Sequence, residues 1–193
     1  MTAATAITDD VRLLTFEEFS DLSLDGPAEL VEGRIVEMAR NNPTHSHLVI
    51  QFGSCLNNWV KESRFGKVFG GDVAIITKRN PDTGRGADVA VVSHERLEGQ
   101  PANATALLVP PELIVEVISP SNTWVDVIAK LTEYFHIGTD QVWIVTPFTQ
   151  TLQVYRSVTD VTGYSVGERP VLEASERLPG LKLDLREVFA GVG

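Results

Sequence analysis

Segment 112–118, with the sequence Glu-Leu-Ile-Val-Glu-Val-Ile, constrains the fold of this chain more than any other feature. It is apolar on both alternating faces, which predicts a β-strand that is covered on both sides. Glu116 then shares a face with Ile114 and Ile118, where an ionised carboxylate is costly unless it is paired, hydrogen-bonded or bound to a metal. The strand alone leaves open whether Glu116 is functional, forms a structural pair with Lys or Arg, or sits at a strand end that water reaches.

The segments around this strand predict a mixed α/β fold whose central β-sheet is flanked by helices and preceded by an N-terminal hairpin. Capping and periodicity predict a short helix from Thr15, a long helix from Pro43 to about Ser63, and a third helix from Thr123 to about Ile137. The turn Glu32-Gly33 predicts the hairpin, within 28–38. Further strands are expected at 67–77, 87–92, 141–145, 152–157, 161–166 and 171–174, and a terminal helical turn at 184–190.

We expect one domain over residues 15–190, after a flexible segment at 1–14. Segment 79–86 is rich in turn residues throughout, and segment 93–111 is expected to be a longer irregular loop. No apolar stretch reaches the ~20 residues of a membrane helix, and the N-terminus lacks the features of a secretory signal. The one cysteine, Cys55, fits a reducing cytoplasm and is expected to be a buried thiol on the long helix.

The net charge argues against one class of partner, nucleic acid. Sixteen Lys and Arg against 26 Asp and Glu give −10 at pH 7, and such a surface repels phosphate backbones. A carboxylate-rich metal site is itself acidic, however, and its metal supplies local positive charge. Basic residues could also cluster on one face, because several lie close together in the sequence: Lys61, Arg64, Lys67, Lys78, Arg79 and Arg85.

Asp88 stands near the start of the short apolar strand 87–92. If this strand is a neighbour of strand 112–118, the carboxylates of Asp88 and Glu116 converge at one point on the sheet. Two oxygen ligands, together with water and a substrate phosphate, are a typical way to hold Mg²⁺. Taken alone, Asp88 is better explained by the turn chemistry of a strand start.

Lys130 lies on the helix that follows strand 112–118. The apolar stripe expected on this helix comprises Trp124, Val127, Ile128, Leu131 and Phe135. Asp126, Lys130 and Tyr134 share a line along the edge of that stripe, so Lys130 can reach over the sheet edge toward Glu116. From the helix alone, a surface pair of Asp126 with Lys130, worth only ~0.3–0.5 kcal/mol, is the simpler explanation.

Several motifs together resemble the Uma-two family, a large bacterial family of endonucleases within the PD-(D/E)xK superfamily. The most specific is the run 111–121, which contains Glu116 and Ser119-Pro120-Ser121 and is followed by Asp126, Lys130, Tyr134, Gly138 and Trp143. Weaker similarities lie at 29–33, His45, Leu48, 87–89, 178–181 and 188–189. The resemblance covers about residues 15–189 and implies a restriction-endonuclease-like fold in a bacterial, cytoplasmic protein.

The resemblance also implies roles for five residues. Asp88 matches the metal-binding aspartate of the superfamily, and Glu116 matches its second acidic ligand. The backbone carbonyl of Val117 is expected to add another oxygen to the metal. Lys130 matches a catalytic lysine that in this family comes from the following helix, and Glu29 matches a glutamate that completes the acidic cluster.

The sequence departs from the superfamily pattern near these residues. Ile118 stands where the usual lysine would follow the glutamate by two positions. Ala87 replaces the proline that normally precedes the aspartate, and that proline does no chemistry. Pro81-Asp82 is a literal match to the motif, but its neighbours form a turn sequence rather than a strand start, so we interpret it as a decoy.

His45 and His47 could suggest a metal pair. Side chains two residues apart on a helix point to different sides, so a capping or helix-start role is the better interpretation. The sequence contains no glycine-rich phosphate loop, zinc-spaced cysteine set or Gly-x-Ser-x-Gly motif.

The combined prediction is a Mg²⁺- or Mn²⁺-dependent endodeoxyribonuclease, a hydrolase that acts on DNA and has no membrane partner. Lys130 would stabilise the negative charge that develops on the phosphate. A homodimer would suit the cleavage of both strands of a duplex. Two other classes stay open: a catalytically inactive nuclease-like fold that binds nucleic acid or protein, and a dimerisation protein in which Glu116 and Lys130 form a purely structural pair.

Overall fold

The computed structural model describes residues 12–119, 122–173 and 175–192. The helices are α1 (Phe16–Ser20), α2 (Pro43–Ser63), α3 (His94–Leu97), α4 (Trp124–His136) and α5 (Leu185–Val188). The strands are β1 (Ala28–Val31), β2 (Arg34–Glu37), β3 (Gly66–Lys78), β4 (Thr83–Ser93), β5 (Leu113–Val117), β6 (Gln141–Thr146), β7 (Thr151–Tyr155), β8 (Val161–Ser165), β9 (Val171–Leu172) and β10 (Leu183–Asp184). Most of the expected flexible segment 1–14 lies outside the described residues, as do Ala174 of the expected strand 171–174 and Pro120 and Ser121 of the Ser-Pro-Ser motif.

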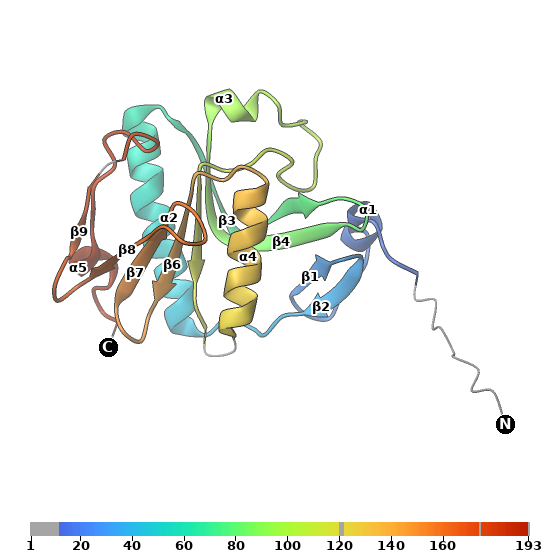
Figure 1. The fold of residues 1–193 in the computed structure, drawn as a ribbon, viewed down its shortest axis with the longest axis horizontal. Coiled ribbons are helices and arrows are strands. Elements are labelled where there is room, and N and C mark those ends of the chain that lie inside the picture. The colour runs from blue at the N-terminus through green and yellow to red at the C-terminus, as the bar shows by residue number, and fades with distance from the viewer. Residues whose placement is uncertain (1–11, 120–121, 174, 193) are drawn as a thin grey trace.

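Eight strands form one mixed sheet in the order β2-β1-β4-β5-β6-β7-β8, with β3 paired to β4 off this path. β5 and β6 are parallel, and the other paired strands of this sheet are antiparallel. α4 makes the crossover between the two parallel strands (Figure 1). The predicted central mixed sheet with an N-terminal hairpin is confirmed.

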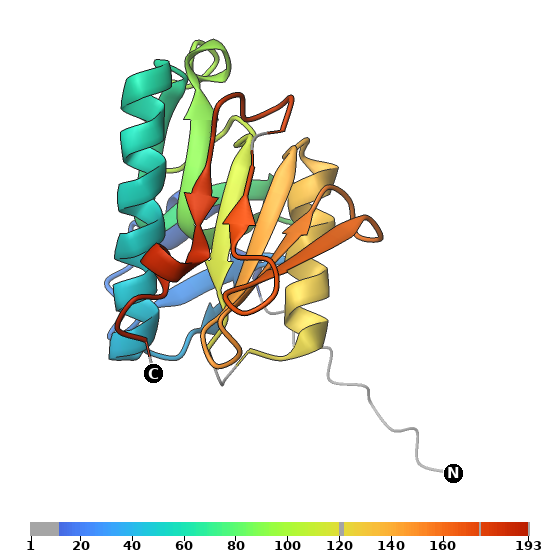
Figure 2. The same cartoon turned by 90° about the vertical axis from the view of Figure 1, so that its left-hand side faces the viewer.

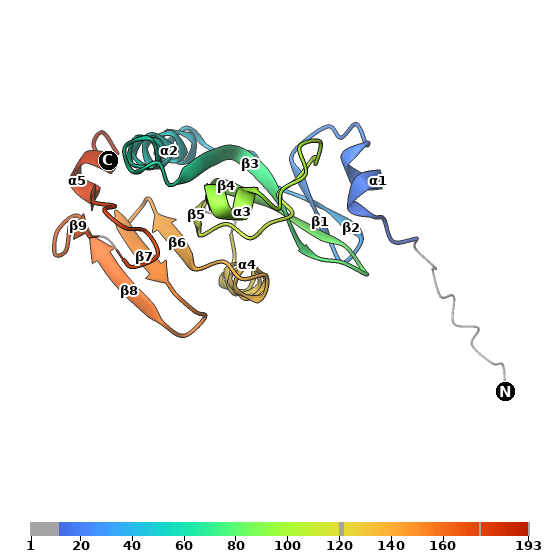
Figure 3. The same ribbon diagram turned by 90° about the horizontal axis from the view of Figure 1, so that it is seen from above.

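The sheet separates two hydrophobic layers, each built on one long helix. α2 packs Leu48 and Phe52 against one face, and α4 packs Val127 and Leu131 against the other. Figures 2 and 3 show the two helices on opposite sides of the sheet. Strand 112–118 therefore lies in the middle of the molecule and is covered on both faces, as its apolar pattern predicts.

Both long helices begin where the sequence provides a cap. Asn42 caps α2 by accepting a hydrogen bond from the backbone of His45, and Thr123 forms a capping box with Asp126 at the start of α4. The expected place of Trp124 in the buried stripe of α4 is wrong, because its side chain is 58% exposed. Tyr134 is fully buried instead, since its hydroxyl finds a hydrogen-bond partner inside the protein.

β4 is longer than predicted, because half of the expected turn 79–86 belongs to it. Thr83 and Gly84 pair with β3, and Gly84 also pairs with Leu30 of β1. A Cβ atom on Gly84 would lie 2.4 Å from the ring of Phe16, so the glycine marks a close approach of α1 rather than a turn. Polar and glycine residues here form a strand because three neighbouring elements cover it.

The remaining sequence expectations concern Cys55 and the membrane. Cys55 is half-buried on α2 and packs against the core, where burial raises the pKa of its thiol. Within the described ranges, no helix combines the length and apolar character that crossing a membrane requires.

Candidate active site

Asp88 and Glu116 come together from the neighbouring strands β4 and β5. Val89 pairs with Val115, and continuing this antiparallel register by one residue places Asp88 opposite Glu116. The backbone N–H of Val117 donates a hydrogen bond to Oδ2 of Asp88 at 2.7 Å, which fixes the carboxylate against the end of β5. Asp88, Glu116 and Val117 all line one cavity of about 290 Å³.

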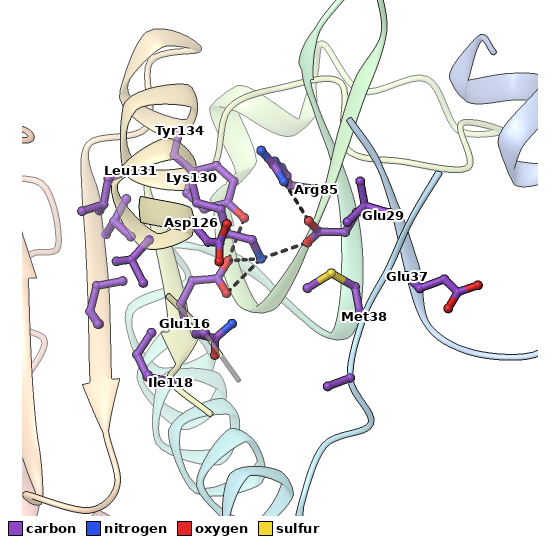
Figure 4. A pocket seen from close by; sticks show the side chains of 16 residues that line it. Glu29, Glu37, Met38, Arg85, Glu116, Ile118, Asp126, Lys130, Leu131 and Tyr134 are labelled. Atoms are coloured by element: carbon purple, nitrogen blue, oxygen red, sulfur yellow. Dashed lines mark hydrogen bonds and ion pairs between the residues drawn. The ribbon is translucent and has the colours of Figure 1, made fainter. Parts of the chain in front are cut away.

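Lys130 reaches the same cavity from α4 and contacts two carboxylates. Its Nζ lies 2.9 Å from Oε1 of Glu29 and 3.4 Å from Oε2 of Glu116. Figure 4 shows the ammonium group between these two acidic side chains. The simpler sequence interpretation, a surface pair with Asp126, is wrong: the Asp126 carboxylate accepts hydrogen bonds from the backbone and hydroxyl of Thr123 instead.

Glu29 is fixed by a buried network on the hairpin side of the cavity. Its Oε1 accepts a hydrogen bond from the backbone N–H of Gly86 at 3.0 Å. Its Oε2 lies 3.0 Å from Nη1 of Arg85, whose Nη2 is 2.6 Å from Glu133. Arg85 therefore anchors Glu29 from one side while Lys130 contacts it from the other.

The neighbours of Glu116 compensate its negative charge only in part. Burial raises its pKa to about 7; Lys130 opposes this shift, and the charges of Asp88 and Glu29 add to it. The hydroxyl of Tyr134 donates a hydrogen bond to Oε1 of Glu116 at 2.7 Å. Burial alone would lower the pKa of Lys130, but Glu116 and Glu29 outweigh burial and raise it, so the ammonium stays charged.

Two further residues of the cavity were not predicted to belong to the active site. Nε2 of His45 lies 3.2 Å from Oδ2 of Asp88, and the histidine is only 3% exposed. Burial alone would lower the pKa of His45, but the hydrogen bond and charge of Asp88 raise it. Asp72 also lines the cavity, and burial together with the charge of Asp88 raises its pKa.

These two omissions have different causes. His45 lies in the first turn of α2, as expected, but Asn42 caps the helix and the His45 side chain contacts Asp88 instead. The similarity of His45 and Leu48 to the family pattern was a usable signal for the site. His47 is exposed, so the prediction that the two histidines point to different sides is confirmed. No sequence pattern indicated that Asp72 belongs to the site. Its position results from the register shift between Gly70 and Val73, and this shift depends on pairing with β4.

The cavity has a second compartment of about 350 Å³, which shares Glu29, Glu116 and Lys130 with the first. We call the two compartments together the acidic cavity. Among the described residues that line it, the acidic side chains are Glu29, Glu37, Asp72, Asp88, Glu116 and Asp126, and the Lys and Arg side chains are Arg85 and Lys130. Negative charge is therefore in excess at the point where β4 and β5 meet.

The basic residues that are close together in the sequence do not all gather on one face. Lys61, Arg64 and Lys67 line a depression at the C-terminal end of α2. Arg79 instead pairs with Glu17 on α1, and Arg85 is inside the molecule. Lys61, Arg64 and Lys67 precede or begin the long strand β3, and Arg79 and Arg85 follow it. The length of this strand separates the two sets in space.

The interpretation of Pro81-Asp82 as a turn is confirmed. Asp82 is 7% exposed and accepts hydrogen bonds from the backbone N–H of Phe16 at 2.9 Å and from Arg79 at 2.7 Å. Its carboxylate therefore attaches α1 to the β3–β4 turn.

A mixed sheet between two helices, with clustered carboxylates and a lysine where β4 meets β5, defines a restriction-endonuclease-like protein. The chain belongs to the Uma2 family, whose model, described as "Putative restriction endonuclease", matches residues 16–186. The fold is similar to a crystal structure from Anabaena variabilis described as a "putative nuclease belonging to DUF820", with a TM-score of 0.76, 22% identity and coverage of 92% of this chain and 98% of the other. A search of curated proteins found no match. Membership of this family supports a nuclease function with nucleic acid as the substrate.

Proposed function

We propose that the chain is a Mg²⁺- or Mn²⁺-dependent endonuclease that hydrolyses phosphodiester bonds in DNA, with its active site at Asp88, Glu116, Glu29 and Lys130. The observation that carries the proposal is the convergence of these four side chains, from four different elements, in one cavity. Buried carboxylates that crowd together and raise one another's pKa are a common mark of functional sites.

The donor set fits a hard divalent cation. Asp88 and Glu116 offer carboxylate oxygens, and Val117, whose carbonyl is the expected third ligand, lines the same cavity. No group of three His, Cys, Asp or Glu side chains in the described parts of the chain could hold a metal by itself. Mg²⁺ does not need such a group, because it commonly binds through one or two carboxylates and keeps several waters.

A divalent cation held there would supply charge relief on the scissile phosphate and a more acidic water. The chain's own residues prepare the rest of the site. Lys130 presents a charged ammonium that can stabilise the phosphate as negative charge develops on it. Tyr134 and His45 orient the carboxylates of Glu116 and Asp88 through the contacts described above.

Asp88→Asn tests the proposal, with Asp82→Asn as the matched control. Both aspartates are buried, at 6% and 7% exposure, and both hold backbone N–H groups, but only Asp88 lines the acidic cavity. We expect Asp88→Asn to abolish Mn²⁺-dependent cleavage of DNA while the circular dichroism spectrum is retained. Asp82→Asn should lower stability and still cleave. Unchanged cleavage by a clean preparation of Asp88→Asn refutes the assignment.

The acidic lining of the cavity favours one second candidate, a nuclease-like fold that binds a partner without cutting. Calorimetric titration with Mn²⁺ discriminates the two functions. The enzyme should bind the ion in a manner that Asp88→Asn abolishes and Asp82→Asn preserves. A binding-only protein should show no affinity for Mn²⁺ that depends on Asp88.

A further inference from the structure

Three large apolar side chains are exposed at one end of the sheet. Trp124 is 58% exposed, Val125 77% and Phe148 97%. Trp124 and Val125 form the start of α4, and Phe148 lies in the connection from β6 to β7. We call these three side chains the aromatic rim. Exposed aromatic side chains that lie at the same end of a molecule, one of them almost fully exposed, are typical of a surface that contacts a partner.

The rim lies at the same end of the sheet as the acidic cavity. β5 and β6 are parallel, so their C-terminal ends lie side by side, and α4 starts after one while the β6–β7 connection follows the other. Figures 1 and 2 show the start of α4 and this connection at the same end of the molecule. Asp126, two residues after Trp124, lines the cavity itself. A chain bound at the cavity can therefore continue around the start of α4 onto the rim.

The charge of the cavity favours such a contact for a nucleic acid. The basic side chains that line the cavity are already engaged: Lys130 contacts Glu29 and Glu116, and Arg85 contacts Glu29 and Glu133. Phosphates approaching the described lining residues meet more carboxylates than free cations, and the whole chain carries −10. A metal ion at Asp88 and Glu116 would attract the scissile phosphate, and contacts that do not depend on phosphate charge would add affinity for the flanking nucleotides.

We propose that the aromatic rim is a stacking surface for unpaired bases next to the scissile phosphate, so that the substrate is single-stranded or locally opened DNA. The inference rests on the proposed function, because it adds a base-binding surface to that active site. Bases inside a duplex have both ring faces covered by neighbouring bases, whereas an unpaired base offers a free face to an aromatic side chain. Stacking of this kind tolerates any sequence, because every base has a ring face that an aromatic side chain can cover.

Tryptophan fluorescence tests the contact directly. The chain has three tryptophans, and Trp59 and Trp143 are 7% and 0% exposed, so a bound base can reach the ring of Trp124 alone. With EDTA present, so that no hydrolysis is involved, we expect a short single-stranded oligodeoxynucleotide to quench the emission of the wild type. The same sequence as a closed duplex should quench much less, and Trp124→Phe should remove the response.

Affinity measurements on the same oligonucleotide provide the second readout. We expect Trp124→Ala and Phe148→Ala each to weaken single-strand binding about tenfold, and Trp124→Phe and Phe148→Tyr to retain it. Ile50→Ala is the matched control, because Ile50 is also exposed, at 68%, but lies on α2. All these side chains are exposed, so the melting temperatures should stay close to that of the wild type.

Three results would overturn the stacking surface: no quenching by the single strand, equal quenching by the duplex, or equal effects of Ile50→Ala and Phe148→Ala. If the wild type self-associates in sedimentation experiments without DNA, and Trp124→Ala abolishes this association, the rim is instead a contact between copies of the chain. Because binding is measured without cleavage, a protein that cuts DNA but fails these tests disproves the rim alone. A protein that passes them but never cuts DNA disproves the proposed hydrolysis alone.

Discussion

Glu112 and Glu116 stand at opposite ends of β5, and their surroundings differ. Glu112 accepts a hydrogen bond from the backbone N–H of Ser93 at 2.8 Å, and its Oε1 lies 3.2 Å from Nε of Arg96. Arg96 also holds Asp140, at 2.8 Å. In this group, which we call the Arg96 cluster, a guanidinium bridges two carboxylates. In the acidic cavity, by contrast, Glu116 shares one ammonium group with Glu29 and lies near Asp88.

The comparison shows how one residue type serves stability at one end of a strand and chemistry at the other. A planar guanidinium with several donors can satisfy both of its carboxylates, so the Arg96 cluster ties α3, β4 and β5 together. In the acidic cavity the pKa of Glu116 is raised, because the carboxyl group is buried and its negative charge is only partly neutralised. A further cation beside this carboxylate would therefore be favourable. Burial is the main cause of this shift, and the excess of carboxylates over cations around Glu116 adds to it.

The largest expected effect separates Glu116→Gln from Glu112→Gln. Glu116→Gln removes a proposed metal ligand, so Mn²⁺-dependent cleavage should fall by a factor on the order of 10³ or more, while the protein stays folded. Glu112→Gln should keep cleavage per folded molecule and lower the free energy of unfolding by about 1–3 kcal/mol, because it weakens a buried ion pair. DNA cleavage assays and urea titrations measure the two quantities. Equal losses of activity would contradict the division of roles along β5.

Lys130→Met and Arg96→Met extend the comparison to the cations. Lys130→Met should lower the cleavage rate by about 10²–10³-fold, as expected for a group that stabilises developing charge. Each variant should also be destabilised, because each strips a cation from buried carboxylates. Only Lys130→Met should recover melting temperature when Mn²⁺ is added, since a bound cation replaces the lost charge. Recovery of both variants, or of neither, would show that the two clusters do not differ in metal binding.

The smallest effect is a dependence of stability on pH. The pKa of Glu116 rises from the ordinary 4.5 to about 7 in the folded protein, so between these values the folded state binds more protons than the unfolded state. Stability from this group is therefore greatest at low pH and falls as the pH rises through about 7, by at most about 3 kcal/mol. Urea titrations in EDTA at pH values on either side of this window should show the fall in the wild type, and Glu116→Gln should flatten it. A steeper curve for the variant would contradict the shift.

Local patterns in the sequence predict the two long helices, the short helices α1 and α5, and most of the strands. They miss α3 (His94–Leu97), which lies in segment 93–111, expected to be an irregular loop. The alternation in 112–118, the cap at Thr123 and the periodicity of α2 all act over a few residues, and the structure has those elements near the expected bounds. Local patterns give the wrong secondary structure where contacts with segments distant in the sequence determine it. Thr83 and Gly84 form a strand because β1, β3 and α1 surround them, and a local rule that favours turns for such residues has no information about those neighbours.

For the candidate site, the sequence supplied the residues and the tertiary structure supplied their relation. Asp88, Glu116, Lys130 and Glu29 could be named from motif resemblance, and Glu116 also from the cost of a carboxylate on an apolar strand. The contact of His45 with Asp88 was not predicted, since it joins residues 43 positions apart in the chain. The same holds for the placement of Asp72 beside them.

The sequence by itself determined the long helices and most of the strands, because backbone periods of 2 and 3.6 residues and end caps are local properties. It also determined that an acidic residue would stand in the central strand. Only the tertiary structure decided that Asp88 faces Glu116, that one lysine must serve two carboxylates, and that Trp124 is exposed beside them. These outcomes depend on strand register and on packing between distant segments, which side-chain chemistry along the chain does not encode locally.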